Sequence, residues 1–217
     1  MRVDMHIHSV YSPDGTMEVK EIVKIARKIG LDAVAITDHN TVKAHLKSEK
    51  YDILIIPGIE VSTAQGHVLV YGVREKIPAG KSIVETAEIA HSLGGIVIAA
   101  HPYRFWSGIG EKNVVENAEV WDAIEVKNSR CKKKSNMRAK ALAEKLGKGM
   151  SAGSDAHYPR EIGLCYVEVN ASTAEDILEE IVKGNAKVFG KDRNALRTLN
   201  YVKKAVGEWI GRGFKRI

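Results

Sequence analysis

The chain has 217 residues, of which 44% are hydrophobic and 28% are charged, a composition typical of one soluble globular domain with a sizeable core. No apolar run approaches the roughly 20 residues that a transmembrane helix requires, and two cysteines, Cys131 and Cys165, are too few for a disulfide framework and have no metal-ligand spacing. The net charge of +6 favours an anionic partner without identifying it. We therefore expect a single domain over residues 1–217.

Short β-rich runs alternate with helical runs along the chain. The helical spacing of Val19, Ile22 and Ala26 predicts a helix that ends just before Gly30. The predicted strands are residues 2–6, 33–37, 53–56, 60–63, 68–71, 96–99, 123–126, 149–151, 167–169 and 186–189. The predicted helices are residues 19–29, 82–93, 134–146, 174–182 and 193–209.

Potential metal ligands close several of the apolar strands. The alternation of strands and helices predicts an α/β fold with a largely parallel sheet. The segments DMHIH, AITDH, IPGIE, VIAAH and MSAGSDAH each end a predicted strand in such ligands. The carboxyl ends of barrel strands share one rim, whereas an open doubly wound sheet would spread these residues along an edge. Their dispersal from residue 6 to residue 157 therefore favours a barrel.

The first candidate ligands, His6 and His8, are two residues apart in an extended run, so both imidazoles point to the same face. Asp14 follows within Ser-Pro-Asp-Gly, a sequence that also suits an ordinary turn. His39 ends the second strand. Its neighbour Asp38 is interpreted as an acceptor that fixes an imidazole tautomer, or as a helix cap, in preference to a direct ligand.

The remaining candidates also lie near strand ends. Glu60 follows an apolar strand, where a carboxylate is costly to bury unless it is paired or binds metal, and its two oxygens could bridge two cations. His67 lies seven residues later and equally suits a strand edge. His101 follows the apolar run IVIAA, and Asp155 and His157 repeat the two-residue spacing of the first pair.

Imidazole and carboxylate ligands without thiolate suit zinc, manganese or iron(II). Nine candidates exceed the four ligands of one structural zinc site and predict two or three divalent ions that share ligands. Such a centre activates water near neutral pH and stabilises the attacking and leaving oxygens of an in-line displacement, which indicates hydrolysis of a phosphate ester. No Gly-rich phosphate loop is present, which disfavours a nucleotide-triphosphate motor.

Other features leave two interpretations open. His45 and His91 lie inside helical runs, and we interpret both as structural. Basic residues gather in residues 127–148 and 192–217, either as solvated helix faces or as a surface that attracts a polyanion. Tyr103, Phe105 and Trp106 lie in a predicted loop, where they either line a pocket or a base-stacking platform or only pack the loop down.

The order of these motifs (HxH, TDH, PGxE, a following histidine, HP and GSDxH) resembles that of the PHP (polymerase and histidinol phosphatase) family of metal-dependent phosphoesterases, over most of the chain. The resemblance implies a distorted (β/α)7 TIM-like barrel with a metal cluster at the C-terminal rim of the strands. It also implies three metal positions, with Glu60 shared by the first two: His6, His8, Glu60 and Asp155; Glu60, His67 and His101; and Asp14, His39 and His157. Some members have histidine where this chain has Asp14.

We expect a phosphoesterase in which a hydroxide that bridges the metal ions attacks phosphorus, with Glu60 and Asp155 as catalytic carboxylates. Asp38 or a metal-bound water would protonate the leaving group. 

For the phosphate group, Arg160 is the first choice, because a guanidinium pairs bidentately with phosphate oxygens. Arg104, Lys127 and Arg130 are weaker candidates for the same role.

The basic segments favour a nucleotide or oligonucleotide substrate over another phosphorylated small molecule, with histidinol phosphate as the alternative. A nucleic-acid-binding protein with a structural metal cluster is the alternative of another class, and an amidohydrolase is disfavoured because Glu60 stands in place of a carboxylated lysine. A cleaved signal peptide would remove the first ligands, so we expect a cytoplasmic protein that does not contact membranes. A monomer is favoured, with the apolar residues of 196–209 packed on the barrel.

Overall fold

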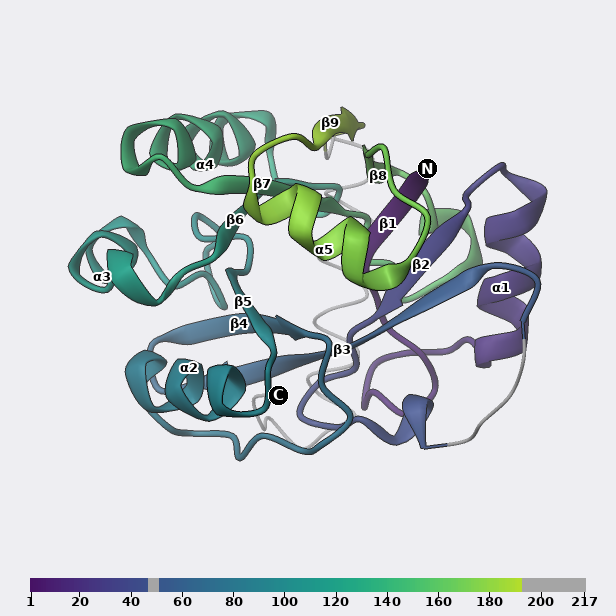
Figure 1. Cartoon of the computed structure of the whole chain (residues 1–217), viewed down its shortest axis with the longest axis horizontal. Helices are drawn as coiled ribbons and strands as arrows, with labels where there is room; N and C mark the ends of the chain where they lie inside the picture. Colours follow the sequence, from purple (N-terminus) through teal and green to yellow (C-terminus); the bar gives the residue numbers. More distant parts are fainter. Residues whose placement is uncertain (47–50, 193–217) are drawn as a thin grey trace.

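The computed structural model describes residues 1–46 and 51–192. Within these ranges, nine strands form one sheet in the order β7-β6-β5-β4-β3-β2-β1-β8-β9 (Figure 1). The strands are β1 (Arg2–Ile7), β2 (Ala33–Ile36), β3 (Leu54–Thr63), β4 (Gly66–Tyr71), β5 (Ile96–Ala99), β6 (Ala123–Asn128), β7 (Gly149–Gly153), β8 (Cys165–Glu168) and β9 (Lys187–Gly190).

The sheet curls until β7 returns to β1. A parallel bridge joins Ile7, at the end of β1, to Ala156, just after β7, and the main-chain N–H of His8 donates to the carbonyl of Ala156 at 2.9 Å. Gly153 permits this approach, because a Cβ at that position would lie 2.2 Å from the Cβ of His6. The sheet is therefore a nearly closed barrel, which confirms the predicted α/β barrel fold.

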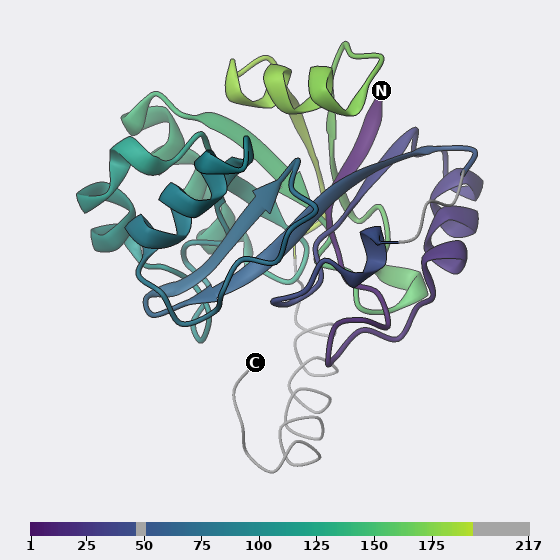
Figure 2. The ribbon, with the colours of Figure 1, turned by 60° about the horizontal axis from the view of Figure 1, so that its bottom comes forward.

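Helices cover the outside of the barrel. Figure 2 shows α1 (Val19–Lys28) on one side and α2 (Ile83–Ser92), α3 (Glu111–Glu116) and α4 (Lys133–Leu146) on the other. The connecting segments contain the 3-10 turns η1 (Lys43–His45), η2 (Ala118–Val120) and η3 (Pro159–Glu161). Among the helices of the described ranges, none combines the length and apolar character that crossing a bilayer requires.

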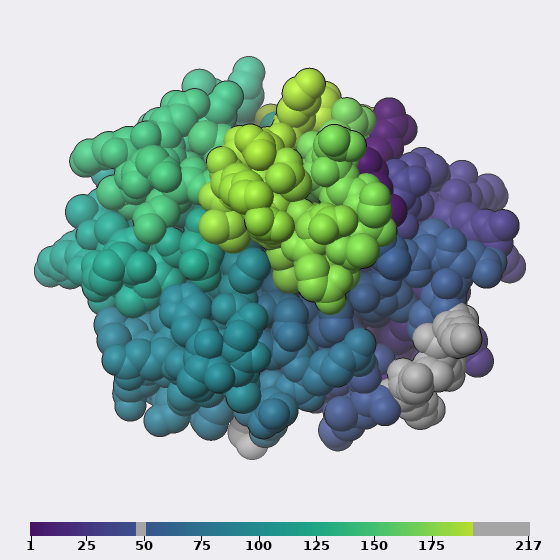
Figure 3. All heavy atoms as spheres, in the orientation of Figure 1, coloured from purple at the N-terminus to yellow at the C-terminus, as the bar shows by residue number. Residues whose placement is uncertain are grey.

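A fifth helix, α5 (Ala174–Val182), lies over the centre of the face seen in Figures 1 and 3. Its side chains Ile177 and Ile181 pack with Met5 and Ile98 of the strands in one buried apolar cluster. Gly149, the first residue of β7, has its Cα directly against the carbonyl of Ile181. Helix α5 therefore closes the amino-terminal end of the barrel and leaves the opposite rim for the polar residues.

The sheet is less parallel than predicted. Four of its eight strand pairs are antiparallel, namely β1–β8, β3–β4, β4–β5 and β8–β9. Strands β3 and β4 are joined by a two-residue turn, which is too short for the crossover that a parallel pair needs. Strand β4 therefore begins at the rim where its antiparallel neighbours, β3 and β5, end.

The structure differs from the prediction in two other places, at β3 and α3, and one predicted helix cannot be compared. The predicted strands 53–56 and 60–63 are one strand, β3, that runs through Pro57 and Gly58. Pro57 stands at the last position of the β2–β3 register, where its missing N–H interrupts little of the ladder. Helix α3 was not predicted. The predicted helix 193–209 and most of the basic segment 192–217 lie outside the described residues.

Asp4 holds the seam between β1 and the segments that follow β7. Its buried carboxylate accepts main-chain hydrogen bonds from Ser154 at 2.8 Å, Gly163 at 2.8 Å and His6 at 3.3 Å. Burial disfavours the charged form and raises the pKa of Asp4 to about 6 in spite of these hydrogen bonds. Asp4 thus satisfies three main-chain donors that closure of the barrel removes from water.

Replacing Asp4 with alanine is expected to lower the free energy of unfolding by about 2–4 kcal/mol, because the three buried N–H groups lose their acceptor. Urea unfolding followed by circular dichroism measures the change. The folded pKa of about 6 lies above the ordinary value of 3.8 for an aspartate, so the contribution of the native carboxyl is complete below pH 3.8 and declines as pH rises through 6. The difference between the two proteins should therefore be larger at pH 4 than at pH 7.

The matched control is Asp52→Ala, which removes the exposed partner of Arg27 and should change stability by less than about 0.5 kcal/mol. An Asp4→Ala protein as stable as this control would show that the seam does not depend on the carboxylate.

Candidate metal centre

All nine predicted ligands meet in one cluster at the carboxyl-terminal rim of the barrel. Every one of them belongs to a group of side chains whose ligand atoms lie within 4.8 Å of one another. They come from β1 and the segment after it (His6, His8, Asp14), the end of β2 (His39), β3 (Glu60), the start of β4 (His67), the segment after β5 (His101) and the segment after β7 (Asp155, His157). Residues separated by 150 positions in the sequence thus become neighbours, as the barrel prediction required.

Glu60 lies at the centre of the cluster. Its Oε1 is 2.8 Å from Nδ1 of His67 and 2.9 Å from Nε2 of His101. Its Oε2 is 3.3 Å from Nε2 of both His6 and His8 and 3.2 Å from Nδ1 of His39. One carboxylate therefore contacts five imidazoles through two oxygens. Burial opposes its ionisation, but the surrounding histidines outweigh burial and hold the pKa of Glu60 well below its usual value.

The first histidine pair forms the inner part of the cluster. Nε2 of His6 and Nε2 of His8 are 3.1 Å apart, and Oδ1 of Asp155 is 3.5 Å from Nε2 of His8. Burial alone would lower the pKa of His8, but Asp155 and Glu60 outweigh it and raise this pKa to about 9. His8 therefore carries a proton at neutral pH, and a metal ion that binds its Nε2 has to displace that proton.

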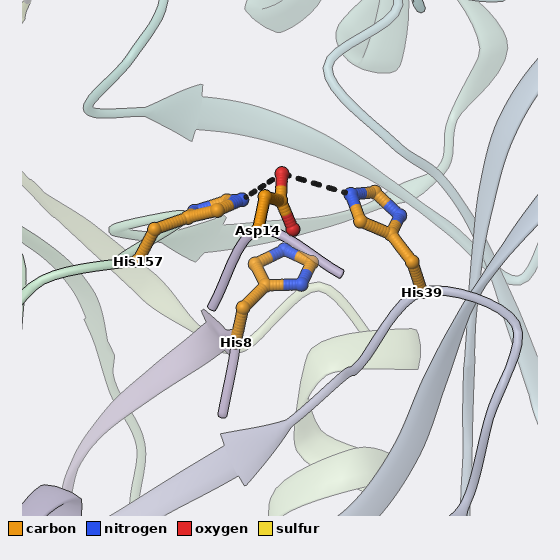
Figure 4. Close-up of side chains that lie close together, drawn as sticks. All are labelled: His8, Asp14, His39 and His157. Atoms are coloured by element: carbon orange, nitrogen blue, oxygen red, sulfur yellow. Dashed lines mark hydrogen bonds and ion pairs between the residues drawn. The ribbon is translucent and has the colours of Figure 1, made fainter. Parts of the chain in front are cut away.

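A second part of the cluster contains His8, Asp14, His39 and His157 (Figure 4). Oδ2 of Asp14 lies 2.8 Å from Nε2 of His157 and 3.8 Å from Nε2 of His39. The family resemblance implied a position held by Asp14, His39 and His157. The structure brings these three together and adds His8, while His39 also approaches Glu60 and His67.

The protonation of His157 favours a cation at this place. Its Nδ1 is 2.9 Å from the carbonyl of Asp155, so the ring proton belongs there, and Nε2 then presents a lone pair to the carboxylate of Asp14. Burial and Arg130 lower the pKa of His157 to about 4, so the ring is neutral at pH 7. Two acceptors 2.8 Å apart repel each other unless positive charge lies beside them, and Nη1 of Arg130, 3.3 Å from Nε2 of His157, supplies part of that charge.

Buried atoms without partners support the same interpretation. Within the described residues, Oδ1 of Asp14 is buried and makes no hydrogen bond, and Nδ1 of His39 has no hydrogen bond beyond its 3.2 Å approach to Oε2 of Glu60. Buried polar atoms are normally hydrogen-bonded, and each exception calls for a cause such as an ion. The donor set of imidazoles and carboxylates fits zinc, manganese or iron(II), so the residues present suit divalent cations.

Backbone strain is concentrated at the rim. Within the described residues, the non-glycine residues with positive φ are Asn40, His101 and Asp155, with φ of 56°, 26° and 55°. His101 and Asp155 each lie two residues after a strand, Asn40 lies four residues after β2, and two of the three are candidate ligands. Such conformations cost free energy and persist only where the surroundings enforce them, which is common at functional sites. The strain aims His101 and Asp155 into the cluster.

Glu125 of β6 is a functional candidate that the sequence analysis missed. Its Oε1 accepts from Nδ1 of His6 at 2.9 Å, and its Oε2 accepts from the main-chain N–H of His101 at 2.8 Å. The amide of Asn128 also donates to this carboxylate and, at 3.2 Å, to Oδ2 of Asp155. Glu125 thereby holds the Nδ1 proton of His6 on the side away from the cluster, so that Nε2 is available to bind a metal ion. A carboxylate commonly accepts from the second ring nitrogen of a metal-binding histidine in this way.

Asp38 does not contact an imidazole as the sequence analysis expected of a tautomer-fixing acceptor. Its two oxygens accept from the main-chain N–H and the hydroxyl of Ser9, each at 2.6 Å. Burial raises its pKa. Asp38 therefore orders the segment that follows His8. His45, interpreted as structural, lies buried with Nε2 2.9 Å from the carbonyl of Ile36.

The four candidate phosphate-binding side chains differ in position. Arg104 donates from Nη1 to Oδ2 of Asp155 at 2.6 Å, and Arg130 lies with Nη1 3.3 Å from Nε2 of His157. Arg160 is exposed in η3, and Lys127 forms an ion pair with Asp192 at 2.8 Å. The geometry thus favours Arg104 and Arg130, which the sequence analysis ranked below Arg160.

Comparisons with known proteins identify relatives of this chain. A family model described as PHP-associated matches residues 133–186. An uncharacterized protein of Methanocaldococcus jannaschii is 31% identical over 191 residues, which span 82% of this chain and 75% of the relative. A protein of Caldicellulosiruptor bescii named as a probable phosphatase is 27% identical, over 88% of this chain and 98% of the relative.

Solved structures share the fold. A two-domain protein of Bacteroides vulgatus, which contains a predicted PHP-like metal-dependent phosphoesterase, has a TM-score of 0.67 at 19% identity, over 88% of this chain and 65% of that one. A lesion-specific endonuclease from Pyrococcus furiosus has a TM-score of 0.66 at 22% identity, over 87% of this chain and 58% of that one.

The barrel, with its rim of imidazoles and carboxylates, has the architecture of a metal-dependent hydrolase. The relatives and the shared fold narrow that class further: the chain belongs to the PHP family.

Metal affinity is expected to rise with pH. Since the pKa of His8 is about 9 in the metal-free protein, the pKa of His6 is also raised by Glu125 and Glu60, and the metal binds only neutral rings, the apparent Kd for Mn²⁺ should fall by at least about tenfold for each pH unit between pH 6.5 and 8.5. Isothermal titration calorimetry in buffers of different ionisation enthalpy measures both the Kd and the protons released. An affinity independent of pH, without proton release, would show that the ion does not bind His8.

Glu125→Gln is expected to weaken Mn²⁺ binding by about 10–100-fold, because an amide cannot accept from His6 and from the N–H of His101 at the same time. Calorimetric titration of the purified variant measures the change. The matched control is Glu116→Gln on the exposed end of α3, which should bind the metal like the parent. Equal affinities for the two variants would rule out a positioning role for Glu125.

Proposed function

We propose that the chain is a metal-dependent phosphoesterase whose active site is the rim cluster. The observation that carries this proposal is the position of Glu60, whose two oxygens contact five imidazoles of the cluster. A carboxylate so placed is suited to bridge two cations, and shared cations suit the displacement of a phosphate ester better than a purely structural role does.

The proposed ligands are the nine rim residues: His6, His8, Asp14, His39, Glu60, His67, His101, Asp155 and His157. Two or three divalent ions held there would supply Lewis acidity and would lower the pKa of a bound water toward neutrality. Glu125 and Asn128 orient the inner ligands from behind. Asp38 orders the chain after His8 through Ser9 and is proposed as a positioning residue, not as the general acid.

Arg104 and Arg130 are proposed to bind the phosphate group. Their side chains are largely buried beside Asp155, with exposed fractions of 18% and 11%. A guanidinium in this position can release part of its interaction with the carboxylate and pair with phosphate oxygens while metal ions compensate the charge of Asp155. Arg160, exposed in η3, is given no such role.

The substrate class is proposed as a nucleotide or nucleic-acid phosphate ester. The basic residues of α4 near the rim favour a polyanion over a small monoester such as histidinol phosphate. The endonuclease from Pyrococcus furiosus shows that this barrel occurs in an enzyme that acts on nucleic acid. The competing hypothesis, a nucleic-acid-binding protein with a structural cluster, predicts binding without turnover.

The purified protein, loaded separately with Mn²⁺ and Zn²⁺, is expected to hydrolyse at least one of five substrates: an aryl phosphate, an aryl phosphodiester, histidinol phosphate, a nucleoside monophosphate and a short oligonucleotide. Glu60→Gln should lower kcat/KM by at least about 1000-fold, because an amide neither bridges two cations nor balances the charge of the histidines. Phosphate release and product chromatography measure the rates.

The control variant is Glu88→Gln on the exposed face of α2, which should retain the parent rate. Metal-loaded protein that turns over none of these substrates, while still binding the oligonucleotide, would favour the structural cluster. Turnover unaffected by Glu60→Gln would place the activity elsewhere.

A further inference from the structure

The loop of residues 101–110 is tightly folded over the rim. The main-chain N–H of Arg104 donates to the carbonyl of His101 at 2.9 Å, and that of Gly110 donates to Pro102 at 2.9 Å. Gly108 is packed so closely that a Cβ would lie 2.5 Å from the carbonyl oxygen of Arg104. The loop therefore holds a defined shape.

Two large aromatic side chains stand exposed at the tip of this loop. Phe105 is 86% exposed and Trp106 is 79% exposed, and their rings meet edge to face with centroids 4.7 Å apart. Adjacent aromatic side chains exposed on a tightly folded loop suggest a binding role, because ordinary packing would bury at least one of them. Flat π faces of this kind stack with nucleic-acid bases.

The aromatic pair lies beside the metal centre in the chain itself. Arg104, on one side of the pair, donates to Asp155 at 2.6 Å. Ser107, on the other side, accepts at its carbonyl from the main-chain N–H of His67 at 3.0 Å. Both flanking residues thus contact candidate ligands. A molecule stacked on Phe105 and Trp106 would therefore lie next to the metal centre.

A basic helix adjoins the same loop. The hydroxyl of Ser135 on α4 donates to the carbonyl of Tyr103 at 3.2 Å, and the guanidinium of Arg138 lies 4.0 Å from the centre of the Tyr103 ring. A shallow hollow on the outer face of α4 is lined by Lys133, Lys134, Met137, Arg138 and Ala141.

Two lysines in the first turn of α4 are placed unfavourably for the stability of the helix. Lys133 and Lys134 are exposed in its first turn, which contains no acidic residue. Positive charge at a helix N-terminus is disfavoured by the helix dipole, so these residues lower the stability of α4. Lys133 interacts electrostatically with Asp192, and an external anion would be a further favourable partner for both lysines.

We propose that the aromatic loop and the outer face of α4 together bind single-stranded nucleic acid. Unpaired bases stack on Phe105 and Trp106, and the backbone phosphates follow Lys133, Lys134 and Arg138. The chemistry of the ligand follows from the pairing of π faces with positive charge, since Lys133 to Arg138 extend the site by about 7.5 Å along α4 beyond the aromatic loop. The delivery of a phosphate to the metal centre rests on the proposed function; the binding itself does not.

The test is fluorescence anisotropy of the full chain with labelled 12-nucleotide DNA and RNA single strands, in EDTA so that hydrolysis cannot intervene. The double variant Phe105→Ala/Trp106→Ala is expected to bind single strands about 10–100-fold more weakly, with a smaller effect on inorganic polyphosphate, which has no bases. The variant Lys133→Gln/Lys134→Gln should weaken both ligands and reduce the slope of log Kd against log salt by about 0.7 for each lysine.

Matched controls lie on α1 and at its C-cap residue Ile29, at the opposite end of the molecule from α4 (Figure 1). Ile29→Ala removes an apolar side chain that is 47% exposed, and Lys24→Gln/Lys28→Gln removes two exposed lysines. Both should bind as the parent does. The DNA and RNA arms show which single strand is preferred.

Three results would overturn the proposal: single-strand affinity unchanged in the aromatic variant, equal losses in the α1 controls, or binding to anionic phospholipid vesicles that depends on Phe105 and Trp106 without single-strand binding. Because the readout is binding without metal, its failure is separate from failure of the turnover assay. Hydrolysis of an aryl phosphate that depends on Glu60 would still support the phosphoesterase.

Discussion

The burial of many ionisable groups in one place is the constraint on which the rest of the structure depends. Six imidazoles lie within a few ångströms of Glu60, Asp155, Asp14 and Glu125 at the barrel rim, and nearly all are removed from water. Burying any one of these charges alone would cost several kcal/mol. The groups are tolerated only because each faces a partner of opposite charge or a place for a cation, so the cluster forms as a unit or not at all.

Closure of the barrel is what allows the cluster to form. Strand β1 contributes His6, and the segment after β7 contributes Asp155 and His157, although the sheet order places five other strands between β1 and β7. Main-chain hydrogen bonds and Asp4 join the two along a seam. Helix α5 fills the opposite end with apolar side chains. The polar rim and the apolar end are thus two consequences of one curled sheet.

Much of this arrangement follows from local sequence. A ligand at the end of an apolar strand is visible in the sequence, because strand propensity and polar endings are properties of a few adjacent residues. Glu125 was missed because alternation along Ile-Glu-Val suggests a solvent-facing side chain, and its partner His6 is 119 residues away. The sequence analysis ranked Arg160 above Arg104 and Arg130, whereas the latter two lie against the rim cluster, because the turn after each strand sets where a side chain points. The antiparallel β4 depended on a two-residue turn that the sequence analysis did not identify.

The positive φ angles of His101 and Asp155 have a consequence for how the protein would respond to its cations. These ligands are held in strained conformations by the fold, so their orientation is set when the chain folds and little ordering is left for the moment an ion binds. The strain lowers the stability of the metal-free chain, and ion binding restores stability in proportion to the logarithm of ion concentration over Kd. The availability of metal in the cell would then govern how much of this protein persists folded, as well as how much of it is active.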